Sequence, residues 1–163
     1  RGTMNQSVSI DSLRTIQFLQ SFTDENLQSI LDISELFLFD QGEILFREGN
    51  RAEFVYLIVF GNVSLEICAA GIGCKRILTI GPGEMLGCST ILEQSQLNET
   101  ATALETTSVL RIKGEALLTL CEHDPKFGLT LMRRTALALA KRLDATRLQL
   151  LDVFGSHMPE VDS

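Results

Sequence analysis

The sequence has few of the residues and runs that mark particular protein classes. It holds no tryptophan, one tyrosine and only two histidines, His123 and His157, among 163 residues. No apolar run reaches the roughly 18 residues that a transmembrane helix needs, so we expect no membrane span. A basic segment followed by a short apolar one, as in secretory signals, is also missing. We therefore expect a cytoplasmic location.

Positive charge is also scarce. Lys and Arg total 14 against 21 Asp and Glu, which gives a net charge of −7. Nucleic-acid-binding domains normally carry a basic patch, so this balance argues against nucleic acid binding by this chain. Five basic residues do gather in the C-terminal segment, where we interpret them as a solvated helix flank: Arg133, Arg134, Lys141, Arg142 and Arg147.

Motifs for catalysis and metal binding are missing as well. The sequence contains no CxxC, HExxH, GxSxG or GxxxxGK. His123 stands near a helix end and is interpreted as a helix C-cap rather than a base. Cys68 and Cys74 flank a glycine-rich turn and could face each other, but we favour reduced, semi-buried thiols. We predict no enzymatic activity, no catalytic residue, no cofactor and no metal site.

The order of the patterns predicts the fold. Residues 9–33 show helical periodicity, with Thr23 as a helix cap. From about 36 to 113, five or more short apolar segments broken by glycines predict an antiparallel barrel or jelly roll. A short helix ending at Pro125 and a helix over about 126–153 follow.

The predicted class is therefore α+β. N-terminal helices precede a jelly-roll barrel with a short internal helix, and a long C-terminal helix follows. We assign residues 4–154 to one domain, with its C-terminal helices at about 114–154. Residues 155–163 are predicted to be a flexible tail, and residues 1–3 a cloning remnant.

The long helix carries two apolar series in a heptad register. Leu129, Ala136, Leu143 and Leu150 recur every seven residues, as do Met132, Leu139, Thr146 and Val153. A further apolar surface lies away from this seam, at Leu131, Leu137, Ala138, Ala145 and Leu148. A helix that is apolar on two sides is covered on two sides. We predict a homodimer through Leu129, Met132, Ala136, Leu139, Leu143 and Leu150, with a helix embedded in its own domain as the alternative.

Two segments carry a family resemblance. GEILFREGNRAEFVYLIVFGNVSL (residues 42–65) and ILTIGPGEMLG (77–87) resemble the cyclic nucleotide-binding domain family, in particular the ligand-sensing half of catabolite-activator-type regulators. FLQSFTDENLQSIL (18–31) resembles the opening helix of that family. Gly49 and Gly61 suit tight strand turns with positive φ. Gly87 would let the backbone approach a ligand at the mouth of a short helix.

The resemblance also implies a phosphate-binding cassette, made here by Gly87, Cys88, Ser89, Glu99, Thr100 and Ala101. In family members that bind a cyclic nucleotide, a Glu after the first Gly takes the ribose 2′-hydroxyl, and an Arg before Ser/Thr-Ala pairs with the phosphate. This sequence has Cys88 and Glu99 at those two positions. A carboxylate about 4 Å from a phosphate repels it by about 4 kcal/mol at an effective dielectric near 20.

Helix N–H groups contribute only about 0.3–1 kcal/mol and cannot offset that repulsion. Rescue would need a distant arginine such as Arg47, Arg51 or Arg76 to reach in. We therefore predict that the cassette does not bind a cyclic nucleotide in the usual way. A reactive Cys88 thiol is an alternative, since a helix start lowers a thiol pKa while the charge of Glu99 raises it.

These observations leave three functional hypotheses. The first is a homodimeric, non-enzymatic sensor module whose small-molecule ligand is absent or is not a cyclic nucleotide. The second is the ligand-binding fragment of a transcription regulator, since the nine residues after Phe154 cannot hold a DNA-binding domain. The third is a weak binder of cyclic AMP or cyclic GMP through backbone contacts. A titration tests the third, and the native chain length beyond Ser163 separates the first two.

Overall fold

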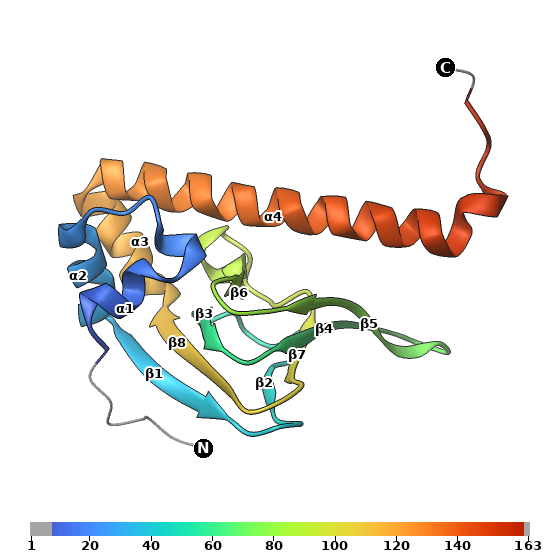
Figure 1. The fold of residues 1–163 in the computed structure, drawn as a ribbon, viewed down its shortest axis with the longest axis horizontal. Coiled ribbons are helices and arrows are strands. Elements are labelled where there is room, and N and C mark those ends of the chain that lie inside the picture. Colours follow the sequence, from blue (N-terminus) through green and yellow to red (C-terminus); the bar gives the residue numbers. More distant parts are fainter. Residues whose placement is uncertain (1–7, 162–163) are drawn as a thin grey trace.

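The computed structural model describes residues 8–161, so the predicted remnant at residues 1–3 lies outside it. Short helices at the N-terminus and the first C-terminal helix cluster at one end of a two-sheet barrel, and a long helix runs over the top (Figure 1). None of the helices in residues 8–161 combines the length and apolar character that a bilayer crossing requires. The cytoplasmic location stays a prediction.

The described N-terminal part contains three short helices, and the predicted cap at Thr23 is confirmed. They are α1 (Ile10–Arg14), the 3-10 helix η1 (Gln17–Leu19) and α2 (Asp24–Asp32). The side chain of Thr23 accepts a hydrogen bond from the Asn26 backbone N–H, which satisfies one of the free donors at the start of α2.

The barrel consists of two antiparallel four-stranded sheets. Within the described residues the strands are β1 (Ser34–Phe39), β2 (Ile44–Phe46), β3 (Phe54–Phe60), β4 (Val63–Ala69), β5 (Gly73–Ile80), β6 (Met85–Leu86), β7 (Thr100–Ala103) and β8 (Thr107–Lys113). One sheet has the order β1-β8-β3-β6 and the other β2-β7-β4-β5. Buried side chains from both sheets, including Ile58, Leu65 and Val109, form one core between them. The predicted α+β jelly-roll class is confirmed.

Two predicted glycine turns are confirmed. Gly49 has φ +84° and Gly61 has φ +94°, in the region that other residues rarely adopt. A Cβ at Gly61 would also lie 2.7 Å from the Cα of Thr107, so no side chain fits there.

The C-terminal part consists of α3 (Gly114–His123), α4 (Pro125–Phe154) and the short 3-10 helix η3 (Gly155–His157). Asp124 caps α4 by accepting hydrogen bonds from the N–H groups of Lys126 and Phe127. Nδ1 of His123 lies 2.8 Å from the carbonyl oxygen of Thr119, as expected for a histidine at a helix end.

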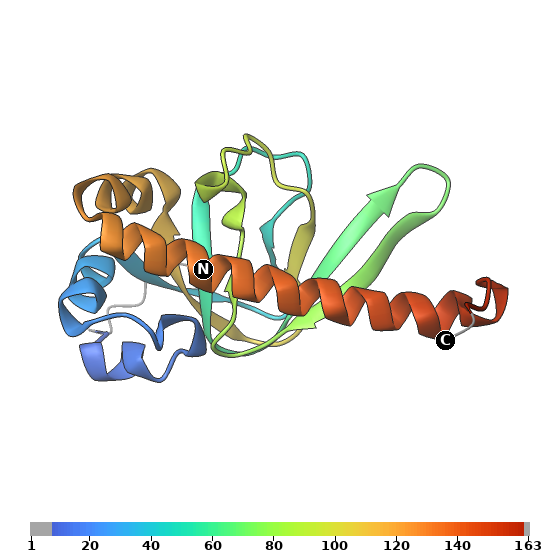
Figure 2. The same cartoon turned by 90° about the horizontal axis from the view of Figure 1, so that it is seen from above.

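Helix α4 is covered by its own domain on one side only. Phe127, Leu131 and Thr135 are buried in a core shared with the N-terminal helices and α3. Of the predicted seam residues, Met132 is half-buried against this core, while Leu129, Ala136, Leu139, Leu143 and Leu150 are exposed. Seen from above, the helix crosses the whole molecule and its C-terminal end extends beyond the sheets (Figure 2).

The prediction of reduced thiols was wrong for Cys68 and Cys74. They stand opposite each other in the β4–β5 hairpin and form a disulfide bond. The six-residue separation and the tight turn between them bring the two Cα atoms to 3.9 Å. Both residues are exposed, not semi-buried, whereas Cys88 and Cys121 are free and partly buried.

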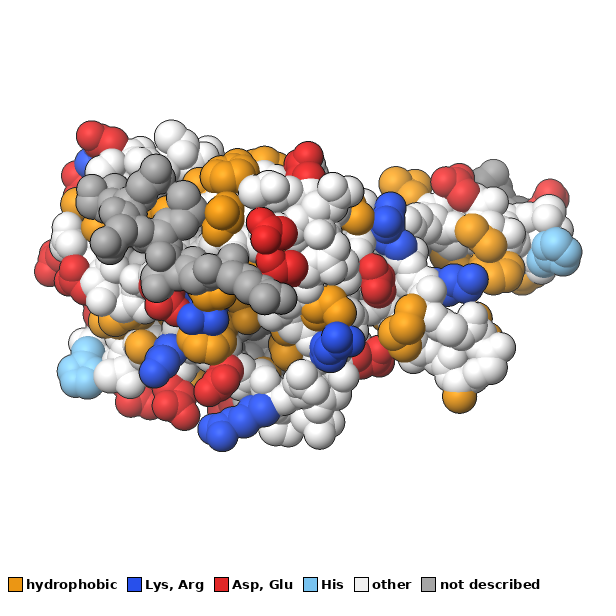
Figure 3. All heavy atoms as spheres, turned by 90° about the horizontal axis from the view of Figure 1, so that it is seen from below, with side chains coloured by type: hydrophobic (Ala, Val, Ile, Leu, Met, Phe, Trp, Pro, Cys, Tyr) orange, Lys and Arg blue, Asp and Glu red, His pale blue; other side chains and the backbone are white. Residues whose placement is uncertain are grey.

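Charges of both signs are interspersed on the face of the barrel opposite α4 (Figure 3). Apolar side chains are visible on that face at the end where the β4–β5 hairpin and the C-terminal end of α4 project. Ile72, at the turn of the β4–β5 hairpin, is 68% exposed.

Candidate ligand cavity between the barrel and the long helix

A cavity of about 380 Å³ lies between the predicted cassette, the β4–β5 hairpin and the middle of α4. Ligand pockets in proteins typically measure roughly 300–1,000 Å³, so this cavity is large enough for a small molecule. It is lined by Ile67, Ile77, Leu78, Gly87, Cys88, Ser89, Leu92, Gln94, Leu97, Asn98, Glu99, Leu139, Arg142, Leu143 and Thr146.

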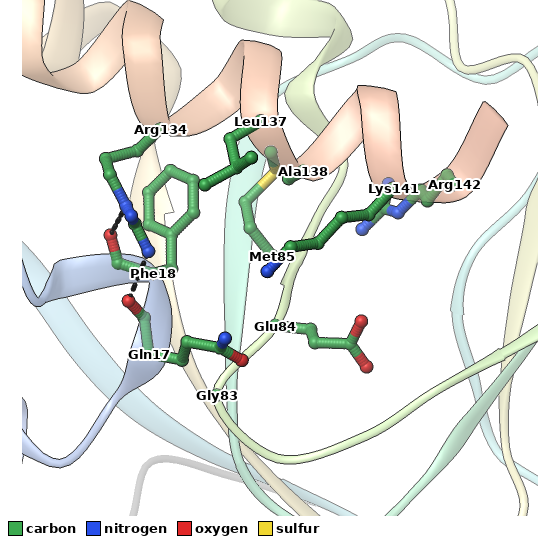
Figure 4. A pocket seen from close by; sticks show the side chains of 10 residues that line it. All are labelled: Gln17, Phe18, Gly83, Glu84, Met85, Arg134, Leu137, Ala138, Lys141 and Arg142. Carbon is green, nitrogen blue, oxygen red and sulfur yellow. Dashed lines mark hydrogen bonds between the residues drawn. The ribbon is translucent and has the colours of Figure 1, made fainter. Parts of the chain in front are cut away.

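A second cavity, which shares Arg142 with the first, is much smaller at about 60 Å³. Figure 4 shows Arg134 crossing its end to donate hydrogen bonds to the backbone carbonyls of Phe18 and Gln17, at 3.0 and 2.6 Å. These bonds tie α4 to the N-terminal helices. We therefore assign this smaller cavity a structural role.

The cassette begins with a turn that only glycine fits. Gly87 has φ +72°, and a Cβ there would lie 2.9 Å from the carbonyl oxygen of Phe54 on β3. Gly87 also lines the cavity. The atoms that leave no room for a Cβ there belong to β3 of the barrel and not to the cavity. The short internal helix that follows, η2 (Cys88–Ile91), is a four-residue 3-10 helix.

The structure brings four of the six predicted cassette residues to the cavity wall. Gly87, Cys88, Ser89 and Glu99 line it. Thr100 and Ala101, by contrast, are buried in β7 and do not line it. The Thr100 hydroxyl accepts a hydrogen bond from the Glu48 backbone N–H at 3.0 Å, so it ties the cassette end to the turn after β2.

Burial raises the pKa of both side chains that depart from the family pattern, Glu99 and Cys88. It raises the pKa of the Glu99 carboxyl, an effect that Arg142 opposes and Glu48 reinforces. Burial likewise raises the pKa of the Cys88 thiol, with Arg142 opposing and Glu99 reinforcing the shift. Reactive cysteines need a lowered pKa, so these surroundings disfavour the hypothesis of a reactive Cys88 thiol.

The cation at this cavity is Arg142, which the sequence analysis did not consider for the site. The three arginines considered for that role, Arg47, Arg51 and Arg76, do not line the cavity. The Nη2 atom of Arg142 is buried and has no hydrogen-bond partner among the described residues. Arg142 is positioned by α4, on the helix face that also carries Leu131, Thr135 and Ala138.

The predicted solvated flank therefore describes only part of the basic cluster. Arg133, Lys141 and Arg147 are exposed, as that interpretation requires. It was wrong for Arg134, which bonds to backbone carbonyls, and for Arg142, which lines the cavity. Helical spacing from the buried Leu131 and Thr135 was the signal that could have identified both.

Comparison with known proteins identifies the family and the fold. A family model described as "Cyclic nucleotide-binding domain" matches residues 36–124, more than half of the chain. The chain belongs to the cyclic nucleotide-binding domain family. As a member, it is a regulatory, ligand-binding type of domain, and the family is not an enzyme family.

Individual relatives agree with this assignment. The chain is 30% identical over 113 residues to the cyclic AMP receptor protein of Thermus thermophilus, which covers 69% of this chain and 50% of the relative. A putative cyclic nucleotide-binding protein from Geobacter metallireducens has a similar structure, with a TM-score of 0.75 and 29% identity over 83% of this chain and 98% of the other.

The Thermus thermophilus catabolite activator protein also has a similar structure. Its TM-score is 0.68 with 26% identity, and the match covers 85% of this chain and 63% of that protein. The chain spans about half the length of the first curated relatives it matches.

Proposed function

We propose that this domain is a homodimeric sensor module whose cavity does not bind cyclic nucleotides in the usual way. The observation that carries the proposal is Glu99, a half-buried carboxylate on the cavity wall, at the position where the family resemblance calls for an arginine.

The charges of the cavity support this. Arg142 supplies one positive charge, but Glu99 supplies a negative one on the same cavity. At about 4 Å and an effective dielectric near 20, each contributes about 4 kcal/mol of opposite sign to an anion that approaches both equally. The cyclic phosphate therefore gains little net attraction.

The ribose of a cyclic nucleotide would also lack the hydrogen-bond acceptor that the family resemblance implies. The resemblance implies a carboxylate acceptor for the 2′-hydroxyl, and Cys88 stands there instead. A thiol is a weak donor and a weak acceptor, and burial raises the Cys88 pKa, which keeps the thiol protonated.

Calorimetry with cyclic AMP and cyclic GMP tests the proposal. We expect no saturable binding with a dissociation constant below about 10 µM, equivalent to about −7 kcal/mol. Tighter binding would contradict it. The double variant Glu99→Arg with Cys88→Glu should gain affinity, and the matched variant Glu99→Gln with Cys88→Ser should not. If the folded Glu99→Arg, Cys88→Glu variant still binds no cyclic nucleotide, these two residues are not the reason why the domain does not bind it.

A second candidate function concerns the whole protein. Relatives 28% identical over 122 residues are named CRP-like cAMP-activated global transcriptional regulators of Mycobacterium tuberculosis, and the match covers 52% of their length. This partial coverage favours the hypothesis that the domain is the ligand-sensing part of a transcription regulator. Sequencing the native reading frame beyond codon 163 tests it: a DNA-binding domain in frame supports the hypothesis, and a stop codon contradicts it.

A further inference from the structure

We propose that the ligand of the large cavity is a small zwitterion with an apolar body, of which an apolar α-amino acid is the simplest example. This inference rests on the proposed function of the cavity as a sensor site. It assigns the cationic group of the ligand to Glu99, its anionic group to Arg142 and its apolar body to the leucine and isoleucine side chains.

The first observation is a pair of opposite charges that attract each other at a distance but form no direct ion pair. Glu99 comes from the segment before β7, on the barrel side, and Arg142 comes from α4. Among the described residues, no ion pair joins them and no hydrogen bond reaches the Glu99 carboxylate. Partly buried charges that lack a direct protein partner are unfavourable, so both groups are suited to a ligand that carries the complementary charges.

The second observation is the buried Nη2 atom of Arg142, which has no partner among residues 8–161. A guanidinium presents parallel N–H donors that match the two oxygens of a carboxylate. Nη2 itself is closed off from the cavity, so a carboxylate bound there would meet the other N–H groups of the Arg142 guanidinium, whose side chain lines the cavity.

The third observation is the composition of the remaining wall. Most of it is apolar, with Ile77 and Leu78 from the hairpin, Leu92 and Leu97 from the cassette segment and Leu139 from α4; Gln94, Asn98 and Thr146 add polar groups. An apolar side chain on the ligand gains from burial against the leucine and isoleucine side chains.

The charge balance of the cavity selects a zwitterion over a simple ion. A monoanion is attracted by Arg142 and repelled by Glu99, and a monocation meets the reverse. A ligand that carries both charges in the right order gains both attractions. The hydroxyl of Ser89, on the same wall, is a further hydrogen-bond partner for either group.

Calorimetry on the whole chain tests the inference with L-leucine and L-phenylalanine as probes. Two analogues remove one charge each: 4-methylpentanoate lacks the ammonium group, and 3-methylbutylamine lacks the carboxylate. We expect at least one amino acid to bind, and each analogue of leucine to bind at least about tenfold more weakly than leucine.

Charge-removing variants identify the two contacts. Glu99→Gln should weaken amino acid binding by about tenfold or more but strengthen binding of 4-methylpentanoate, because the repelling carboxylate is gone. Arg142→Gln should weaken amino acids and 4-methylpentanoate alike. The control Arg147→Gln alters an exposed arginine of the same helix, paired with Asp144, and should change neither affinity.

The outcomes separate this inference from the proposed function. Absence of amino acid binding at about 10 mM, with no tight cyclic AMP binding either, overturns the zwitterion inference alone. Equal affinity for leucine and either analogue overturns it as well. Tight cyclic AMP binding overturns the proposed function and this inference together.

Discussion

Helix α4 is buried by its own domain at its start, whereas its C-terminal half leaves apolar side chains exposed. Leu131, in the first part, is 2% exposed, whereas Leu143 and Leu150 are 51% and 49% exposed. The first part completes the core with the N-terminal helices. The second part borders the cavity and the disulfide-bonded hairpin and, within the described chain, has no cover on its outer side. One helix thus serves folding at one end, and we infer that it serves assembly at the other.

The largest expected effect concerns assembly. Leu143→Glu together with Leu150→Glu should convert the predicted dimer to a monomer in sedimentation experiments, because each carboxylate buried at an interface costs several kcal/mol. The control is Leu148→Glu, which changes a 63% exposed leucine outside the heptad seam and should leave the dimer intact. If the unmodified protein is already a monomer at tens of micromolar, the C-terminal half of α4 does not form a dimer interface.

The next effect concerns the buried end. Leu131→Ala should lower the free energy of unfolding in urea by about 2–5 kcal/mol, since it removes buried methyl groups and leaves a cavity. Leu148→Ala is the matched control. That leucine is 63% exposed on the same helix and should change stability by no more than about 0.5 kcal/mol. Similar losses in both variants would show that α4 is not anchored at Leu131.

The third effect concerns the β4–β5 hairpin, which lies beside the C-terminal half of α4. Replacing Cys68 and Cys74 by Ser should lower the free energy of unfolding by about 2 kcal/mol, the loop-closure contribution for so short a loop. A reducing agent should have the same effect on the original protein and none on this variant. Cys121→Ser, which removes a free thiol, should leave the response to reducing agent unchanged. Equal stability with and without reducing agent would mean that the bond does not form in solution.

The smallest effect concerns Glu99. Its pKa in the folded protein is raised, chiefly by burial, so ionisation at neutral pH destabilises the fold. Glu99→Gln should therefore stabilise the protein at pH 7–8, by no more than about 1 kcal/mol because the group is half-buried. The gain should disappear as the pH falls below the unfolded carboxyl pKa near 4.3.

Urea unfolding from pH 4 to pH 8 measures this dependence. Glu160→Gln, at an exposed carboxylate near the C-terminus, serves as the control and should show no such trend. A gain from Glu99→Gln that grows at low pH would contradict the proposed environment of Glu99.

Local signals in the sequence predicted most of the fold. Thr23 caps α2 and Gly61 turns between β3 and β4 as expected, because capping and positive φ depend on neighbouring residues. The run without proline, and without glycine after residue 128, predicted the length of α4 correctly, and the heptad pattern lies on that helix. It also predicted that the helix has more apolar surface than one barrel covers, and the exposure of Leu143 is consistent with that pattern.

The parts that failed depend on contacts between distant segments. Arg142 reaches the cavity only because α4 docks against the barrel, and a basic residue on an amphipathic helix looks solvated when it is considered alone. The disulfide depends on the register of one hairpin, which places Cys68 directly opposite Cys74. The crowding around Gly87 comes from the carbonyl of Phe54 on β3, more than thirty residues earlier in the chain.

Leu139 and Leu143 line the cavity and also stand in the predicted dimer seam. A ligand and a second subunit would therefore touch the same two side chains from opposite sides. Binding free energies coupled in this way are reciprocal: the factor by which a ligand changes dimer affinity is the factor by which dimerisation changes ligand affinity. In the proposed dimer, no separate relay between ligand and subunit interface would be needed, because two adjacent turns of α4 would couple the state of the cavity to subunit association.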